Sequence, residues 1–293
     1  MEGREVVLQG EMVLRIWDVE HGACAMLQHQ IGDYGGRLAM IDSGCTDTWH
    51  PSSYIKNHMG RSVLDYLFIT NADQDHMSDL KGLDSSGVAV TTLVRNPTYS
   101  GQQMAGIKAV SGPLTRDAEW YVSACDRFNS PVSEPFDNHM AGITATWFFK
   151  PYPQFVKTND LSLVVFIKYA GFKILFPGDL EGAGWRALLD RADFRAELMN
   201  TNILVASHHG RFSGFCEEAF NHFTPDAVVV SDKPIMHETQ RMVPDYRRLV
   251  SGKGVMVRTT SKRRHVLTTR RDGWIQFRVD GNGGYFIDTE YAG

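Results

Sequence analysis

Five apolar runs of strand length in this sequence each end in residues that can carry a charge or bind a cation. Apolar runs of this length, bounded by turn residues, predict β-strands. Polar side chains that follow such strands lie at the edge of a sheet. The runs and their polar residues are Arg37 to Ile41 with Asp42; Leu64 to Thr70 with Asn71, Asp73, Asp75 and His76; Phe172 to Phe176 with Asp179; Asn202 to Ser207 with His208 and His209; and Ala227 to Ser231 with Asp232 and His237.

The run that ends at Thr70 carries the densest group, with four potential metal ligands in six residues. Oxygen and nitrogen donors collected at one edge of a sheet can bind a divalent cation. Taken alone, this Asp-rich segment could equally be a solvated turn that caps a helix at Asp75 or Ser78. Recurrence of the same pattern at five strand ends favours a metal site.

The remaining pattern predicts an α/β sandwich in a single domain, residues 1–293. The chain has 293 residues, 43% hydrophobic and 22% charged, which excludes a disordered or coiled-coil protein. Strands and helices alternate in two halves without a long linker. Residues 84–142 form a variable insertion with one expected helix, Thr115 to Phe128. Further strands are expected at Met12 to Val19, Ala23 to His29, Ile143 to Phe149, Leu161 to Tyr169 and Gly254 to Thr259, and helices at Gly184 to Arg191, Phe215 to Phe223 and Pro244 to Val250.

Cysteine usage and hydropathy predict a cytoplasmic protein. The four cysteines have no Cys-x-x-Cys spacing, and the first residues lack the apolar core of a signal peptide. No apolar stretch approaches the roughly 20 residues that cross a bilayer, so no membrane span is expected.

The net charge of −4 hides a strongly basic segment, residues 241–271. This segment has ten Lys or Arg and one acid, whereas the rest of the chain has 20 basic and 33 acidic residues. Basic residues near Trp274 and Phe277 suit phosphate contacts and base stacking. The alternative is the solvated tip of a hairpin, in which alternation sends neighbouring charges to opposite faces. The residues expected to bind nucleic acid are Arg258, Lys262, Arg263, Arg264, Arg270 and Arg271.

These motifs together resemble the metallo-β-lactamase fold superfamily. Within it, the sequence is most similar to the hydrolase domain of ComEC-type DNA-uptake proteins, whose cluster reads His-x-Asp-x-Asp-His. The resemblance runs from about Met12 to Asp280 and implies an αββα sandwich with a metal site at the shared edge of two sheets. Its motifs are Asp18-Val19, Ile41-Asp42-Ser43-Gly44, Thr70 to His76, Asn159, Asp160 and Ser162, Gly178-Asp179, and Ser207-His208-His209-Gly210.

The resemblance also implies a role for each residue of the site. Asp75, His76, Asp179 and His208 would bind one ion, with Asp179 placed to bridge two. Asp73 would bind a second ion together with Asn159 or Asp160. Asp42 would orient the ligands from behind, and His209 is a weaker candidate of the same kind. His237 would meet the leaving group or phosphate, and His21 lies in a turn that resembles one facing the metal edge in the family.

Asn71 departs from the family pattern, which has a histidine at this position. An amide oxygen is a weaker ligand than imidazole, so the pattern leaves open whether one ion or two are bound. A ligand set rich in oxygen favours Mn²⁺, with Zn²⁺ and Mg²⁺ as alternatives.

The expected chemistry is hydrolysis without a covalent intermediate. A bound divalent ion lowers the pKa of water from about 15.7 toward ~7, and Asp73 or Asp75 would orient or deprotonate that water. The resemblance implies a nuclease or phosphodiesterase that cleaves DNA or RNA, either alone or with a protein partner, as an effector of anti-phage defence. The alternatives are a hydrolase of small esters, lactones or cyclic nucleotides, and a metal-poor binding module, which Asn71 suggests.

Overall fold

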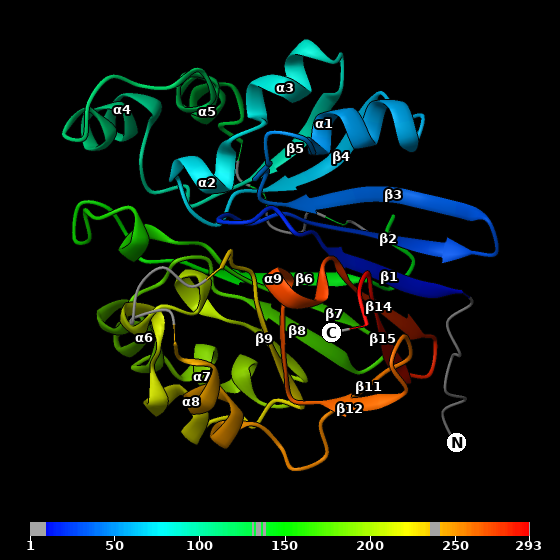
Figure 1. The fold of residues 1–293 in the computed structure, drawn as a ribbon. Helices are drawn as coiled ribbons and strands as arrows, with labels where there is room; N and C mark the ends of the chain where they lie inside the picture. The colour runs from blue at the N-terminus through cyan, green and yellow to red at the C-terminus, as the bar shows by residue number, and fades with distance from the viewer. Residues whose placement is uncertain (1–9, 131, 133–135, 137–138, 235–240, 293) are drawn as a thin grey trace, which may run out of the picture.

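The computed structural model describes residues 10–292 except 131, 133–135, 137–138 and 235–240. Two β-sheets pack face to face, and helices cover their outer faces (Figure 1). The nine-stranded sheet contains, in spatial order, β12 (Lys262–Arg264), β11 (Val255–Val257), β15 (Tyr285–Thr289), β14 (Ile275–Asp280), β1 (Glu11–Ile16), β2 (Ala25–Ile31), β3 (Tyr34–Ile41), β4 (Val63–Phe68) and β5 (Ala89–Val94). The six-stranded sheet contains β13 (Val266–Thr268), β10 (Ala227–Val230), β9 (Ile203–Val205), β8 (Phe172–Phe176), β7 (Val164–Tyr169) and β6 (Thr144–Phe148).

The helices divide between the two outer faces, which confirms the predicted αββα sandwich (Figure 1). The nine-stranded sheet is covered by α1 (Pro51–Ser53), α2 (Gln74–Met77), α3 (Leu80–Ser85), α4 (Gly101–Ala109) and α5 (Arg116–Arg127). The six-stranded sheet is covered by α6 (Gly182–Leu189), α7 (Ala192–Leu198) and α8 (Val243–Leu249). α9 (Thr269–Asp272) follows β13, a π-helical turn spans Tyr54–His58, and short 3₁₀ segments span Asn159–Leu161, Ser207–Gly210, Phe212–Gly214 and Glu217–Asn221.

Strand β7 shows why some apolar runs of this sequence are continuous and do not alternate with polar residues. Val165 and Ile167 pack into the core between the sheets, whereas Val164 and Phe166 pack against the helices of the other face. A strand buried on both faces needs apolar side chains at every position. Among the described residues, no helix combines the length and the apolar character needed to cross a membrane.

Parallel pairing brings the polar strand ends to one edge. β3, β4 and β5 run parallel in the first sheet, and β8, β9, β10 and β13 run parallel in the second. The backbone N–H of Leu163 donates to the carbonyl of Thr70 over 2.7 Å and ties the two sheets together at this edge. The carboxyl ends of strands from both sheets therefore meet.

The expected helix from Phe215 to Phe223 is wrong. Only short 3₁₀ segments form there, and the rings of Phe220 and Phe223 stack with centroids 5.3 Å apart. Strands β14 and β15, which extend the nine-stranded sheet beside β1, were not expected from the sequence.

Candidate metal centre

A compact group of four side chains lies where the two sheets meet. Its members are Asp75, His76, Asp179 and His209, called the acid–histidine cluster below. One potential ligand atom from each residue lies within 4.8 Å of the corresponding atoms of the others. Asp75 and His76 belong to α2, which follows β4, while Asp179 follows β8 and His209 follows β9. The predicted convergence of strand ends thus produces a group able to hold a cation.

His76 is held between two buried carboxylates. Its Nδ1 lies 2.8 Å from Asp42 Oδ2, and its Nε2 lies 3.1 Å from Asp179 Oδ1. Asp42 is itself fixed, because its Oδ1 accepts the backbone N–H of Thr70 over 2.7 Å. A carboxylate behind an imidazole orients the ring and strengthens it as a ligand. Asp42 therefore lies behind the ring of His76, and its support of a metal ligand stays a prediction from the resemblance.

His209 turns one ring nitrogen, Nε2, toward the carboxylates of the cluster. Its Nδ1 lies 3.0 Å from the carbonyl oxygen of Ser231, so Nδ1 carries the proton that this carbonyl accepts. Its Nε2 lies 3.1 Å from Asp75 Oδ2 and 3.5 Å from Asp179 Oδ1, but these contacts are not aligned as hydrogen bonds. In the described part of the chain, only these two carboxylates or a bound cation can satisfy this buried nitrogen. The residues of the cluster therefore fit a divalent cation.

The charged groups of the cluster shift one another's pKa values. Burial alone would raise the pKa of Asp179, but His76 and His209 lower it far below its usual range. Burial would likewise raise the pKa of Asp75, and the same two imidazoles lower it strongly. Burial alone would lower the pKa of His76, yet Asp179 and Asp42 raise it well above its ordinary value. Protons on the imidazoles thus balance the carboxylates when no ion is bound.

His209 lies in the cluster where His208 was expected, and His208 lies beside it. His208 Nε2 lies 3.9 Å from Asp179 Oδ2, and Nδ1 lies 3.6 Å from Glu181 Oε1, so this ring borders the cluster instead of completing it. Both histidines have left-handed backbone angles, with φ of 51° and 53°. Strand alternation therefore does not continue through this turn. Such conformations are strained in non-glycine residues and concentrate at functional sites.

The residues expected to bind a second ion form a separate hydrogen-bonded group. Asn71 Nδ2 donates to Asn159 Oδ1 over 3.0 Å and to Asp73 Oδ2 over 3.3 Å. Asp73 also pairs with Lys108 in α4, whose Nζ lies 2.9 Å from Asp73 Oδ1. Asp160 lies apart from this group and pairs with Lys150 over 3.5 Å. His237 lies outside the described residues.

Four arginines in or near the basic segment are paired with acids. Arg258 pairs with Asp288, Arg264 with Asp272, Arg270 with Asp232 and Arg248 with Glu217. Arg263 donates to the carbonyl of Gly254 over 3.0 Å. Lys262 and Arg271 are exposed, with no ion pair among the described residues. Folding thus neutralises much of the charge that the sequence concentrates here.

The basic residues also differ in their position relative to the cluster. Arg270 and Arg271 follow the carboxyl end of β13, at the same edge as Asp179 and His209. Strand β12, which contains Lys262, Arg263 and Arg264, precedes the amino end of β13 and lies toward the opposite end of the sheet (Figure 1). The structure therefore does not bring the backbone of these three residues to the cluster.

Two cationic side chains that the sequence analysis did not consider lie beside the site. Arg211 Nη2 lies 3.1 Å from His21 Nε2, and Arg211 Nη1 lies 3.4 Å from His208 Nε2. Burial and the nearby His209 lower the pKa of His21 to about 4, so its neutral ring accepts from Arg211. Lys108 comes from the insertion. Of the two, only Arg211 could have been found from the sequence, because it lies two residues after His209.

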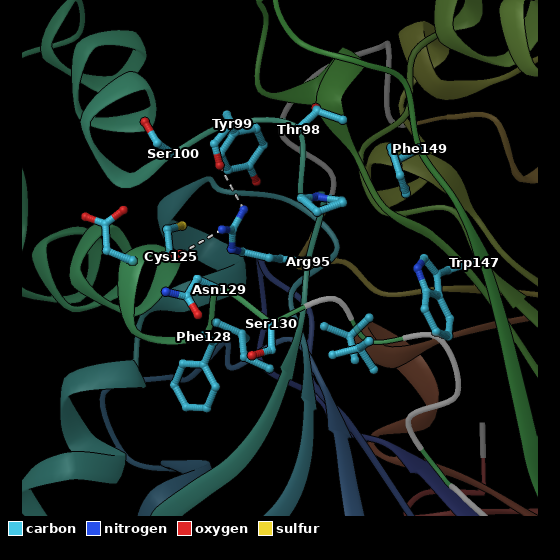
Figure 2. Close-up of a pocket in the computed structure, with 15 residues that line it drawn as sticks. Arg95, Thr98, Tyr99, Ser100, Cys125, Phe128, Asn129, Ser130, Trp147 and Phe149 are labelled. Carbon is cyan, nitrogen blue, oxygen red and sulfur yellow. Dashed lines mark hydrogen bonds between the residues drawn. The ribbon is translucent and has the colours of Figure 1, made fainter.

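Two cavities lie near this region. One, of about 670 Å³, borders Asp73, Lys108 and Asn159. The other, of about 760 Å³, lies between the ends of β5 and β6 and shares no residue with the cluster (Figure 2). In that cavity the guanidinium of Arg95 donates to the carbonyls of Tyr99 and Cys125 over 3.0 and 2.8 Å. Arg95 thus braces the backbone there.

Comparison with known proteins returns only distant similarity. No protein-family model and no curated protein matches the chain. A solved structure assigned as a metal-dependent hydrolase from Parabacteroides distasonis aligns with 81% of this chain and 93% of its own, at 13% identity and a TM-score of 0.43. A diphosphatase of the PhnP family aligns with 92% of this chain and 98% of its own, at 10% identity and a TM-score of 0.42.

A third solved structure, assigned as a metallo-β-lactamase from Thermotoga maritima, covers 64% of this chain and 90% of its own. Its identity is 13% and its TM-score 0.35. Similarity at this level carries no conclusion about activity. The functional proposal therefore depends on the geometry of the acid–histidine cluster, and the similarity to ComEC-type hydrolases stays a prediction.

Proposed function

We propose that the chain is a metal-dependent hydrolase that cleaves phosphodiester bonds, with nucleic acid as its substrate. The observation that carries this proposal is the convergence of four potential ligand atoms, from Asp75, His76, Asp179 and His209, within 4.8 Å of one another. Among the described residues, the buried Nε2 of His209 in this group has no aligned hydrogen bond. Two imidazoles held from behind and two carboxylates form a ligand set suited to Mn²⁺ or Zn²⁺. We favour Mn²⁺.

The residues around the cluster suit hydrolysis. A divalent ion held by the four side chains would supply an acidified water and polarise the oxygen under attack. The side chain of Asp75 is 23% exposed, while that of Asp179 is 6% exposed, so Asp75 is the carboxylate open to solvent. Asp75 is therefore the carboxylate that would orient the attacking water. Asp73, which the sequence offered for the same role, is instead paired with Lys108.

The position of Arg211 favours an anionic substrate. Its guanidinium lies at the edge of the cluster and contacts imidazoles, with no carboxylate within ion-pair distance among the described residues. Guanidinium groups bind phosphate in a planar, bidentate manner. A free arginine at this place favours a phosphodiester over an uncharged lactone or ester.

The exposed ring of Phe212 favours nucleic acid over a small phosphodiester as the substrate. The side chain follows Arg211 directly and is 65% exposed. Exposed aromatic side chains can stack on bases, which contributes about 1–3 kcal/mol per base. A small phosphodiester is the second candidate, because three of the six residues expected to bind nucleic acid are already paired with Asp272, Asp288 and Asp232.

Cleavage assays separate these candidates. Single-stranded DNA, duplex DNA, RNA and bis(4-nitrophenyl) phosphate are incubated with Mn²⁺, Mg²⁺, Zn²⁺ or EDTA. We expect Mn²⁺-dependent cleavage that disappears in Asp75→Ala and Asp179→Ala. Phe212→Ala is expected to lose at least tenfold more activity on nucleic acid than on the small diester. Equal losses on both substrates would favour the small-molecule candidate, and cleavage that persists in both aspartate variants would refute the proposed site.

A further inference from the structure

The group expected to bind a second cation has a different character from the acid–histidine cluster. Both carboxylate oxygens of Asp73 already accept hydrogen bonds. Oδ1 accepts from Lys108 Nζ over 2.9 Å, and Oδ2 accepts from Thr158 Oγ1 over 2.8 Å and from Asn71 Nδ2 over 3.3 Å. The groups that surround Asp73 are therefore donors, whereas a cation requires acceptors.

Lys108 is fixed in this position by two acceptors. Besides Asp73, its Nζ donates to the carbonyl oxygen of Ala72 over 2.7 Å. The Lys108 side chain is only 18% exposed, and it projects from α4, whose start is capped by Ser100 and Gln103. A helix with a complete capping box begins at a defined residue. The ammonium thus has a set place beside Asp73.

Because Asp73 is engaged by Lys108, Asn71 would have to bind a second cation without it, and it cannot. Its Nδ2 is turned toward Asp73 and Asn159, and its buried Oδ1 has no hydrogen-bond partner in the described part of the chain. One neutral amide oxygen falls short of the roughly six oxygen ligands that a hard cation takes. The residues present therefore do not fit a second divalent ion while Lys108 is in place.

We propose that the ammonium of Lys108 occupies the place of the second cation, so that the chain binds one divalent ion and not two. The inference rests on the proposed function, because it assumes that the acid–histidine cluster binds the first ion. Lys108 and Asp73 also border the cavity of about 670 Å³. The positive charge that a second ion would present to that cavity is thus supplied by the protein itself.

The test counts Mn²⁺ ions per chain, by calorimetric titration up to millimolar Mn²⁺ and by elemental analysis after removal of excess ion. We expect one ion in the wild type. Lys108→Met should bind two, the second more weakly, because Asp73 then becomes available. Lys108→Arg should bind one. Lys157→Met is the matched control, because Lys157 borders the same cavity and is exposed, and it should bind one.

Two ions in the wild type would overturn the inference and leave the proposed function standing. One ion in a folded Lys108→Met would also overturn it, since Lys108 would not be what excludes the second ion. No ion in the wild type would defeat the proposed function itself. If Lys108→Met fails to fold, Asp73→Asn decides. This variant should still bind one ion, because Asp73 pairs with Lys108 and binds no ion, whereas loss of the single ion would place that ion at Asp73 and contradict the inference.

Discussion

The Nδ1 atom of His209 lies 3.0 Å from the carbonyl oxygen of Ser231, and this contact turns the opposite ring nitrogen toward Asp75. His76 is arranged in the same way by Asp42. In both imidazoles, therefore, an acceptor behind the ring fixes one nitrogen, and the other nitrogen faces a carboxylate of the cluster. An acceptor behind the ring is also usual for histidines that bind metals.

Replacing Asp42 with Asn should weaken metal binding. The variant keeps the shape of the side chain, and Asn tolerates the positive φ of 59° at this position. It removes the negative charge behind His76, and such losses typically cost about 10–100-fold in metal affinity. Calorimetric titration with Mn²⁺ measures the change. The exposed Asp47→Asn should bind as the wild type does, and an unchanged affinity in Asp42→Asn would count against the supporting role of Asp42.

Metal binding should release protons. Burial alone would lower the pKa values of His76 and His209, but the neighbouring carboxylates raise both above the ordinary value. A raised pKa keeps each imidazole protonated to higher pH, and an ion must displace these protons. Mn²⁺ affinity should therefore increase as the pH rises above about 6.5. Titrations in two buffers of different ionisation enthalpy should give different heats, whereas equal heats would mean that no proton is displaced.

Arg211→Ala should raise the KM for phosphodiester substrates. A hydrogen bond to a charged group contributes about 1.5–3 kcal/mol, so its loss should raise KM by about tenfold or more. The binding of Mn²⁺ should change much less, because Arg211 lies beside the cluster and not in it. Arg191→Ala removes an exposed arginine paired with Asp193 and serves as the control. An unaltered KM in Arg211→Ala would remove the main support for an anionic substrate.

Arg264→Glu should destabilise the fold. Arg264 pairs with Asp272, whose side chain is 1% exposed, and the variant would place two carboxylates together. Breaking a buried pair costs about 3–5 kcal/mol, and the partial exposure of Arg264 reduces this to about 2–3 kcal/mol. Denaturant unfolding measures the loss. Lys262→Glu, on the same strand but exposed, should unfold as the wild type does. Equal stability of both variants would show that the pair with Asp272 contributes little.

The sequence predicted which strand ends gather at the edge of the sheets. It did not predict which of His208 and His209 faces the cluster. Apolar runs fix where strands end, and parallel pairing then gathers Asp42, Asp75 and Asp179 at one edge. The two histidines follow β9 in left-handed conformations, so neither strand nor helix periodicity indicates which ring faces the cluster.

The contributions of Lys108 and of the basic segment could not be predicted for a different reason. Lys108 reaches Asp73 only because α4 of the insertion packs over that edge, 35 positions further along the chain. The charge of residues 241–271 is reduced because Asp272 and Asp288, just beyond the segment, fold back onto its arginines. Net charge along a sequence does not give the charge of a surface. A role in anti-phage defence and a protein partner stay predictions from the resemblance.

The most direct test of the metal centre is calorimetric titration of Mn²⁺ into the wild type, His209→Ala and His208→Ala. The structure places Nε2 of His209 in the cluster and His208 beside it. We predict saturable binding in the wild type, loss of that binding in His209→Ala, and a much smaller effect in His208→Ala. No binding to the wild type, or undiminished binding to His209→Ala, would contradict the proposed centre.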